Sequence, residues 1–281
     1  MRKGSASRTA IWVSVLRGLA DLERPPIVTD RVAASLVPRP YRALLAAAHS
    51  APRATGVVLR ALAKASGDRS RHMSLRTRAI DDVIAQEASE GCRQVVLLGA
   101  GLDARAYRMP SLRDAVVFEV DHPDTQAYKQ PRATLLPRAA ADVRFVPVDF
   151  GHQSIRTELA RAGFDAAKRS VFVWEGVTMY LDPAAIDRTV ESVSALMCRG
   201  SAFATTYYDL EERLEGRVVG MLVGVVGEPF KTRMSPVEVT RVLAPHGLLV
   251  EADESDLDWT RRYLGHVSGT SLERLVVARK S

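Results

Sequence analysis

The sequence predicts an α/β protein with a Rossmann-like, doubly wound and mostly parallel seven-stranded sheet, an N-terminal helical cap and an inserted lid. Two observations carry this prediction. Seven short apolar runs follow one another from residue 94, most of them at the roughly 25–30-residue spacing of a strand plus a crossover helix. Upstream, residues 5–85 are rich in Ala, Leu and Arg, contain no such run and are expected to be helical.

The predicted strands are the apolar runs themselves. Segments such as VVLL and VFV are apolar at successive positions, as expected for parallel strands that are buried on both faces. The last two runs lie close together, which favours a final pair with one antiparallel strand. The seven runs are 94–100, 115–121, 143–149, 170–176, 201–208, 247–253 and 274–280.

We expect a single domain in two parts. Residues 1–85 form the cap, which prolines break into short helices, and residues 86–281 form the catalytic domain. Between the fifth strand and a helix that begins near Ser235–Pro236, an insertion at about 209–235 is expected to act as the lid.

The composition is that of a globular enzyme, with 47% hydrophobic and 26% charged residues in 281. Cys92 and Cys198 are too few for a disulfide framework or a Cys-rich zinc site, and no His or Cys pair has zinc-ligand spacing, so we expect no metal and a reducing, cytoplasmic setting. The longest apolar run, 218–226, is far shorter than the ~20 residues of a membrane span. The basic start lacks a clean apolar core and a cleavage site, so no signal peptide is predicted.

Positive charge is concentrated at the front. Residues 1–80 contain 15 Lys and Arg against 4 Asp and Glu (net +11), whereas the remainder contains 24 against 29 (net −5). Such a segment can attract an acidic substrate or a nucleic acid. The arginines are nevertheless spread out and no aromatic residues are interleaved with them, so solvated helix faces are favoured and nucleic acid is not the expected partner.

The strongest local motif is VVLLGAGLDARAYR at 95–108, where a buried strand runs into Gly99-Ala100-Gly101. Glycines allow a ligand to approach the backbone closely at the carboxyl end of the strand, and a helix is expected to follow. Gly99, Gly101 and Ala104 also match the dinucleotide fingerprint, with acidic residues about 20 positions on. On this motif alone, a nicotinamide or flavin enzyme stays open.

Acidic residues close the next three strands and favour a different nucleoside. Glu119 and Asp121 lie on the same side of the second strand, where a carboxylate can accept from ribose hydroxyls. Asp149 ends the third strand, near an adenine amino group, and Glu175 and Tyr180 follow the fourth. So much negative charge suits the cationic sulfonium of S-adenosylmethionine better than a second pyrophosphate.

These residues resemble the leucine carboxyl methyltransferase family, especially its bacterial branch of S-adenosylmethionine-dependent methyltransferases, over nearly the whole chain. The resemblance implies a class I methyltransferase fold. A looser match comes first, in LRGLADLERPPIVTDRVA (16–33). The matching blocks are LRTRAIDD (75–82), QVVLLGAGLDARAYR (94–108), VFEVDHPDTQAYK (117–129), FVPVDF (145–150), WEGVTMYL (174–181) and GEPF (227–230).

The resemblance also implies roles for individual residues. Arg76 would hold the methionine carboxylate of S-adenosylmethionine, with Glu175 near its amino group, and the Gly99 loop would pass beneath that part. Asp121 would bind the ribose, and Asp149 with the Phe150 backbone would hold the adenine. Ala104 and the run at 20–22 depart from the usual family residues, which affects the assignment of the acceptor more than that of the cofactor.

Simpler interpretations stand beside these roles. Arg76 can be read as an ordinary exposed arginine, and Asp149 as the cap of the next helix. Glu119 would then only support Asp121. Catalytic residues are not identified, and Tyr180 and His152 are weak candidates.

The sequence therefore predicts an S-adenosylmethionine-dependent O-methyltransferase that acts on a hydroxyl or carboxylate of a small molecule, such as a secondary metabolite, without a membrane partner. Three alternatives remain: a protein C-terminal carboxyl methyltransferase, an RNA-modifying enzyme that uses the basic front segment, and a nicotinamide oxidoreductase.

Overall fold

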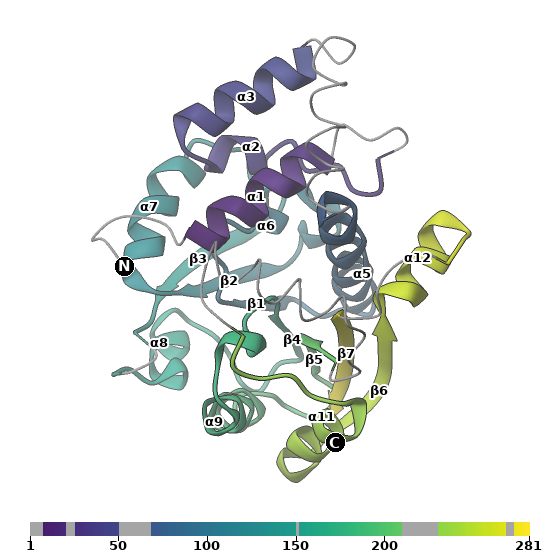
Figure 1. Ribbon diagram of the computed structural model, residues 1–281. Helices are drawn as coiled ribbons and strands as arrows, with labels where there is room; N and C mark the ends of the chain where they lie inside the picture. Colours follow the sequence, from purple (N-terminus) through teal and green to yellow (C-terminus); the bar gives the residue numbers. More distant parts are fainter. Residues whose placement is uncertain (1–7, 21–25, 51–68, 150–151, 210–229, 268–272) are drawn as a thin grey trace.

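The computed structural model describes residues 8–20, 26–50, 69–149, 152–209, 230–267 and 273–281, which form a central sheet with helices on both faces (Figure 1). The predicted α/β class is confirmed. Parts of the predicted cap (1–7, 21–25 and 51–68) and most of the predicted lid (210–229) lie outside the described residues. No described helix combines the length and the apolar character needed to cross a bilayer.

The sheet has seven strands in the order β3-β2-β1-β4-β5-β7-β6. Strands β1 to β5 are parallel to one another, and β7 runs antiparallel to both β5 and β6. The predicted antiparallel strand of the final pair is confirmed. The strands are β1 (Gln94–Leu98), β2 (Val116–Asp121), β3 (Asp142–Pro147), β4 (Ser170–Trp174), β5 (Ala202–Tyr208), β6 (Leu248–Ser255) and β7 (Glu273–Lys280).

The helices cover the two faces of the sheet, and α8, α9 and α11 lie on the face opposite to α1, α5 and α12 (Figure 1). Strand β1 shows why both faces are covered: Val95 and Leu97 belong to the core beneath α5, whereas Val96 and Leu98 belong to the core beneath α9. The helices are α1 (Arg8–Ala20), α2 (Ala33–Leu36), α3 (Arg39–Ser50), α5 (Arg69–Ser89), α6 (Arg105–Arg108), α7 (Pro123–Ala133), α8 (Ile155–Arg161), α9 (Pro183–Ser194), α11 (Pro236–Leu243) and α12 (Asp256–Leu264), with 3₁₀ turns η1 (Pro110–Leu112), η2 (Thr178–Tyr180) and η3 (Ala244–His246).

Two helix predictions need correction in detail. Pro40 is one of the prolines expected to break the cap into short helices, but it lies in the first turn of α3, where its missing N–H has no intrahelical partner to lose. The helix expected after the glycine loop is the single turn α6, which ends at Arg108. Pro110 follows two residues later, and proline cannot continue a helix.

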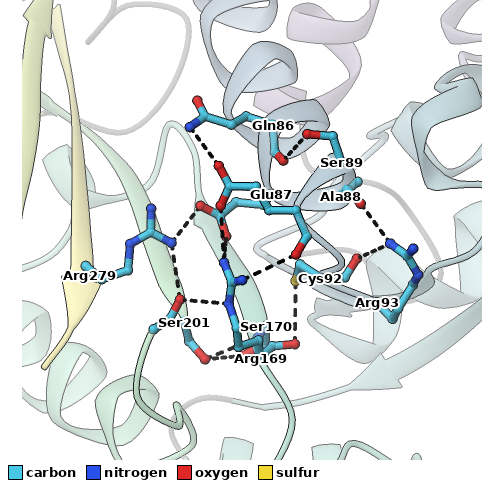
Figure 2. A network of polar contacts seen from close by, with 12 residues as sticks. Gln86, Glu87, Ala88, Ser89, Cys92, Arg93, Arg169, Ser170, Ser201 and Arg279 are labelled. Atoms are coloured by element: carbon cyan, nitrogen blue, oxygen red, sulfur yellow. Dashed lines mark hydrogen bonds and ion pairs between the residues drawn. The ribbon is translucent and has the colours of Figure 1, made fainter.

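Helix α5 is fixed to the far end of the sheet by a buried carboxylate (Figure 2). Glu87 accepts from Arg169 Nη2 at 3.0 Å and from Arg279 Nη1 at 2.7 Å, and Figure 2 shows it between the two guanidinium groups. Arg169 directly precedes β4 and Arg279 lies in β7, so the helix is tied to two strands. Arg76, nearer the other end of α5, lies at the opposite edge of the sheet, where it lines the cavity described below.

The centre of the sheet offers a direct stability test. Phe172 in β4 has an exposed fraction of 0% and packs edge-to-face with Phe164, at a centroid distance of 5.6 Å. We expect Phe172→Ala to lower the free energy of unfolding by about 3–5 kcal/mol, because it removes buried apolar surface and leaves a cavity. Urea titration measures the change. Leu135→Ala, at a position that is 84% exposed, is the control and is expected to change it by less than about 0.5 kcal/mol; equal effects would contradict this description of the core.

Candidate functional site

A cavity of about 240 Å³ lies at the carboxyl ends of β1, β2 and β4, and helix α1 lines its other side. In a doubly wound sheet this is the crevice where ligands bind, because the strand order reverses on either side of β1. The glycine loop, Asp121, Glu175, Arg76 and Tyr180 all line it. The fold therefore brings together residues that the sequence spreads over more than one hundred positions.

The glycine loop is packed too tightly for side chains. Gly99 and Gly101 have φ of +67° and +50°, in the left-handed region that favours glycine. A Cβ on Gly99 would lie 3.0 Å from Val177 Cγ2, and one on Gly101 would lie 3.1 Å from Ala10 Cβ of α1. The loop is thus held between the segment after β4 and the cap, with its backbone at the cavity wall.

Asp121 is a fixed acceptor at the end of β2. Its two carboxylate oxygens accept from the backbone N–H groups of Gly101 (2.5 Å) and His122 (2.6 Å). Burial raises the pKa of Asp121, and these two donors oppose that rise. Each carboxylate oxygen has a second lone pair, so the group can also accept from ligand hydroxyls.

Glu175 is a buried anion held by two arginines. It accepts from Arg76 Nε at 2.9 Å and from Arg105 Nη1 at 2.7 Å. Although burial opposes ionisation, the Arg105 and Arg76 guanidinium groups hold the pKa of Glu175 well below its usual range. Glu175 is therefore an unprotonated, fixed negative charge at the cavity wall.

The same two arginines extend the network to residues that the sequence did not single out. Arg76 donates to Glu273 at 3.0 Å, and Arg105 donates to Asp81 at 2.7 Å and to Asp103 at 2.5 Å. Arg76 is only 4% exposed, so its interpretation as an ordinary exposed arginine is wrong. Asp81, Asp103 and Arg105 lie inside the motif blocks, so the sequence contains a signal for them. Glu273 lies in the last strand, outside every motif block, and no nearby sequence feature points to it.

Asp149 lies beside the cavity and is not among the described residues that line it. It follows β3 directly after Val148, whose N–H donates to the Asp121 carbonyl at 2.9 Å, so it sits next to the end of β2. Asp149 does not cap the next helix, because Ser154 is the N-cap of α8. His152 is exposed and away from the cavity lining, and Phe150 lies outside the described residues.

Tyr180 stands at the cavity within a group of aromatic rings. Its ring meets that of Phe230 at 5.8 Å, edge-to-face, and Phe230 meets Tyr208 at 4.8 Å. Burial raises the pKa of Tyr208, and the nearby Glu273 carboxylate adds to the rise. Tyr208 ends β5, Tyr180 ends the turn η2 that follows β4, and Phe230 belongs to the predicted lid.

Glu119 lies behind the cavity, not in its lining. It is 1% exposed, and its carboxylate lies 2.6 Å from Nζ of the buried Lys129 in α7. Burial raises the pKa of Glu119 from 4.5 to about 7, although Lys129 works in the opposite direction. This placement agrees with the simpler interpretation that Glu119 supports Asp121. Within the ranges that the structure describes, no group of three His, Cys, Asp or Glu residues could hold a metal ion.

A comparison with family models decides the relationship. The model described as leucine carboxyl methyltransferase matches residues 10–194, which is more than half of the chain. The chain belongs to this family. Leucine carboxyl methyltransferases use S-adenosylmethionine, as the sequence motifs implied, and the cavity residues Arg76, Gly99, Asp121 and Glu175 all fall inside the matched range.

Curated relatives agree with this membership. A protein of Mycolicibacterium gilvum, named "Putative S-adenosyl-L-methionine-dependent methyltransferase", is 37% identical over 208 residues, which cover 72% of this chain and 66% of that protein. One of Mycobacterium avium with the same name is 36% identical over 219 residues, covering 73% and 67%. The chain thus spans about two thirds of the length of these relatives.

Solved structures share the fold at low sequence identity. A protein from Thermobifida fusca described as a "putative methyltransferase" gives a TM-score of 0.57 at 17% identity, with 79% of this chain and 88% of that one covered. A DUF574 family protein from Streptomyces avermitilis gives 0.56 at 16% identity, covering 82% and 91%. Magnesium protoporphyrin IX methyltransferase from Synechocystis, solved with bound S-adenosylhomocysteine, gives 0.50 at 13%, covering 74% and 84%.

The buried Glu119–Lys129 pair predicts a pH dependence of stability. The folded protein binds the Glu119 proton more tightly than the unfolded chain does, so this group lowers the free energy of unfolding as the pH rises from 4.5 to about 7. By linkage, the loss amounts to about 3 kcal/mol. Replacing both partners, Glu119→Gln with Lys129→Met, removes this contribution and flattens the profile in that window.

Urea unfolding of both proteins from pH 4.5 to 8 measures the difference between their profiles. Asp114→Asn, at an exposed carboxylate, is the control that should leave the profile unchanged. Parallel profiles for the wild type and the double variant would show that Glu119 titrates normally.

Proposed function

We propose that this leucine carboxyl methyltransferase family member is an O-methyltransferase that transfers a methyl group from S-adenosylmethionine to a carboxylate or hydroxyl of a small molecule, such as a secondary metabolite. The observation that carries the proposal is the cavity itself. A glycine loop, an Asp121 carboxylate fixed by backbone donors and the Glu175 anion meet there, under a cap helix.

The residues present fit S-adenosylmethionine. The loop at Gly99 and Gly101 has a positive-φ backbone that lines the cavity and can lie against a ligand, and Asp121 offers acceptors for ribose hydroxyls. In this proposal Arg76 and Glu175 would meet the charged groups of the methionine part, and Asp149 would meet the adenine. When bound, the cofactor supplies an electrophilic methyl group on a positively charged sulfur.

The residues of the cavity favour a methyl acceptor that is already ionised at neutral pH. Both carboxylates that border the cavity from the strand ends are engaged: Asp121 by backbone N–H groups and Glu175 by two arginines. A general base needs a lone pair that is free to take a proton at neutral pH, and Glu175 is held ionised far too strongly for that. A carboxylate acceptor needs no base, whereas a phenol of pKa ~10 does.

Helix α1 gives the chain a way to keep water out. Thr9, Ala10 and Val13 of α1 line the cavity opposite the ends of the strands. Excluding water strengthens the electrostatic interactions in the site and keeps donor and acceptor in contact. The aromatic rings of Tyr180 and Phe230 provide an apolar surface for the acceptor beside it.

Two alternative substrates remain, a protein and an RNA. Methylation of a protein's C-terminal carboxylate is the nearest alternative, and the name of the matched family favours it. RNA is less favoured, because the basic segment has no interleaved aromatic residues, and two of its arginines, Arg17 and Arg76, are buried. Cys92 and Cys198 are free thiols, which supports a cytoplasmic location.

Asp121→Ala tests the nucleoside site. Losing both carboxylate acceptors should weaken binding of S-adenosylhomocysteine by roughly 100-fold or more, since hydrogen bonds to charged groups contribute about 1.5–3 kcal/mol each. Isothermal titration calorimetry measures the affinity, with NAD as a second ligand that should not bind. Asp114→Ala removes an exposed carboxylate and is the matched control. Unchanged affinity of the Asp121 variant would place the nucleoside elsewhere.

An acceptor screen separates the alternatives. Methyl-labelled S-adenosylmethionine is offered with aromatic and aliphatic carboxylic acids, with phenols, with a peptide that ends in a free leucine carboxylate, and with RNA. We expect label in the small carboxylic acids, released as methanol by mild base because the product is an ester. Label confined to the peptide would favour the protein substrate, and RNA binding that falls steeply with salt would favour the nucleic-acid alternative.

A further inference from the structure

Helix α3 of the cap is exposed on almost every side. It lies at the edge of the molecule, where it contacts α1 and α2, which lie between it and the sheet (Figure 1). Among its described side chains only Leu45 is buried, and a Cβ on Gly18 of α1 would lie 2.8 Å from Leu45 Cδ1. Leu45 is therefore the side chain that the helix buries against the cap, and the rest of its described surface faces solvent.

The exposed surface of α3 includes large apolar side chains. Tyr41 is 41% and Leu44 is 46% exposed, and their three-residue spacing puts them on one face of the helix. Trp12 of the neighbouring helix α1 is 40% exposed. The described part of the chain exposes seven large apolar side chains, and the two aromatic ones, Trp12 and Tyr41, both belong to the cap. Tryptophan and tyrosine are the residues enriched where proteins meet the boundary between water and lipid.

The same helix carries positive charge that no carboxylate balances. Arg39 and Arg42 are exposed, are also three residues apart, and form no ion pair within the ranges that the structure describes. Exposed arginines elsewhere, such as Arg78 and Arg138, pair with an aspartate four residues further on. Unpaired arginines on an exposed helix attract an anionic partner.

The sequence around α3 has the same charge. From residue 31 to residue 67 it contains six Arg and Lys and no Asp or Glu, a net charge of +6. A second copy of this chain would bring an equal positive charge to the same face, so a symmetric contact between copies is disfavoured. RNA would neutralise the arginines, but it would present its polar phosphate backbone to Leu44.

An anionic lipid bilayer matches both properties of this face, because its head groups are negatively charged and its acyl chains are apolar. A basic amphipathic helix is typical of proteins that lie on such a surface. We propose that α3 binds reversibly to the surface of an anionic lipid bilayer, with Tyr41 and Leu44 at the acyl boundary and Arg39 and Arg42 at the phosphates. The absence of a membrane-spanning segment, on which the expectation of no membrane partner was based, does not bear on surface binding.

Vesicle flotation of the full chain tests the inference. The wild type should float with vesicles of equimolar phosphatidylcholine and phosphatidylglycerol and not with phosphatidylcholine alone, and added salt should release it by screening. Arg39→Gln with Arg42→Gln should lower the partition coefficient roughly 10- to 30-fold. Tyr41→Ser with Leu44→Ser should lower it about 10-fold or more, because it removes the apolar surface that enters the bilayer.

Matched controls make the same changes outside the cap. Arg113→Gln with Arg161→Gln removes two exposed arginines, and Val237→Ser with Leu249→Ser removes two exposed apolar side chains. Both controls should bind vesicles as the wild type does. Melting temperatures separate loss of lipid contact from unfolding, and if one of the α3 variants is destabilised, the other decides the question.

Failure of the wild type to bind the anionic vesicles overturns the inference, and so does equal binding by the wild type and both α3 variants. RNA binding that depends on Arg39 and Arg42, without vesicle binding, would assign this face to a nucleic acid. A dimer that Tyr41→Ser with Leu44→Ser dissociates would assign it to a second copy of the chain; either result contradicts the inference. The inference does not rest on the proposed function, since S-adenosylhomocysteine binding is measured separately and its failure would leave the vesicle result unchanged.

Discussion

The site depends on one buried ionic contact, the pairing of Glu175 with Arg76 and Arg105. A buried charge is tolerated only when its partners are close and well oriented, so each element that supplies a partner must be in place. Those partners come from α5, from the start of α6 and from the segment after β4, and Arg105 also reaches Asp81 and Asp103. The geometry of the cavity is therefore set by charge pairing between elements as well as by the sheet.

Buried charged side chains also connect the cap to the sheet. Asp30 of the cap lies 3.4 Å from Arg108, which also donates to Asp81 of α5 at 2.6 Å. Arg17 donates to the loop carbonyl of Leu102. Two arginines of the basic front segment, Arg17 and Arg76, are thus buried in the interior. A count of charges along the sequence overstates the basic surface available to a nucleic acid.

The fold by itself does not identify the cofactor. The doubly wound sheet with a glycine loop serves several cofactors, so it does not separate a methyltransferase from a dinucleotide enzyme. The family membership and the curated relatives make that separation. In the proposed function, the cap and the aromatic rings of Tyr180, Phe230 and Tyr208 would select the acceptor.

The sequence by itself determined the α/β class, all seven strands, the antiparallel end of the sheet, the glycine loop and the acids that follow β2 and β4. These are local signals, because apolar periodicity, glycines and strand ends are read within a few residues. The structure alone decided that Arg76 is buried between Glu175 and Glu273, that Asp149 stays out of the cavity lining and that Arg17 is buried in the cavity wall. Arg76 and Glu273 are 197 residues apart in the chain, and Arg105 and Glu175 are 70 apart. Such pairs follow no sequence period, so only the folded chain can show which charges meet.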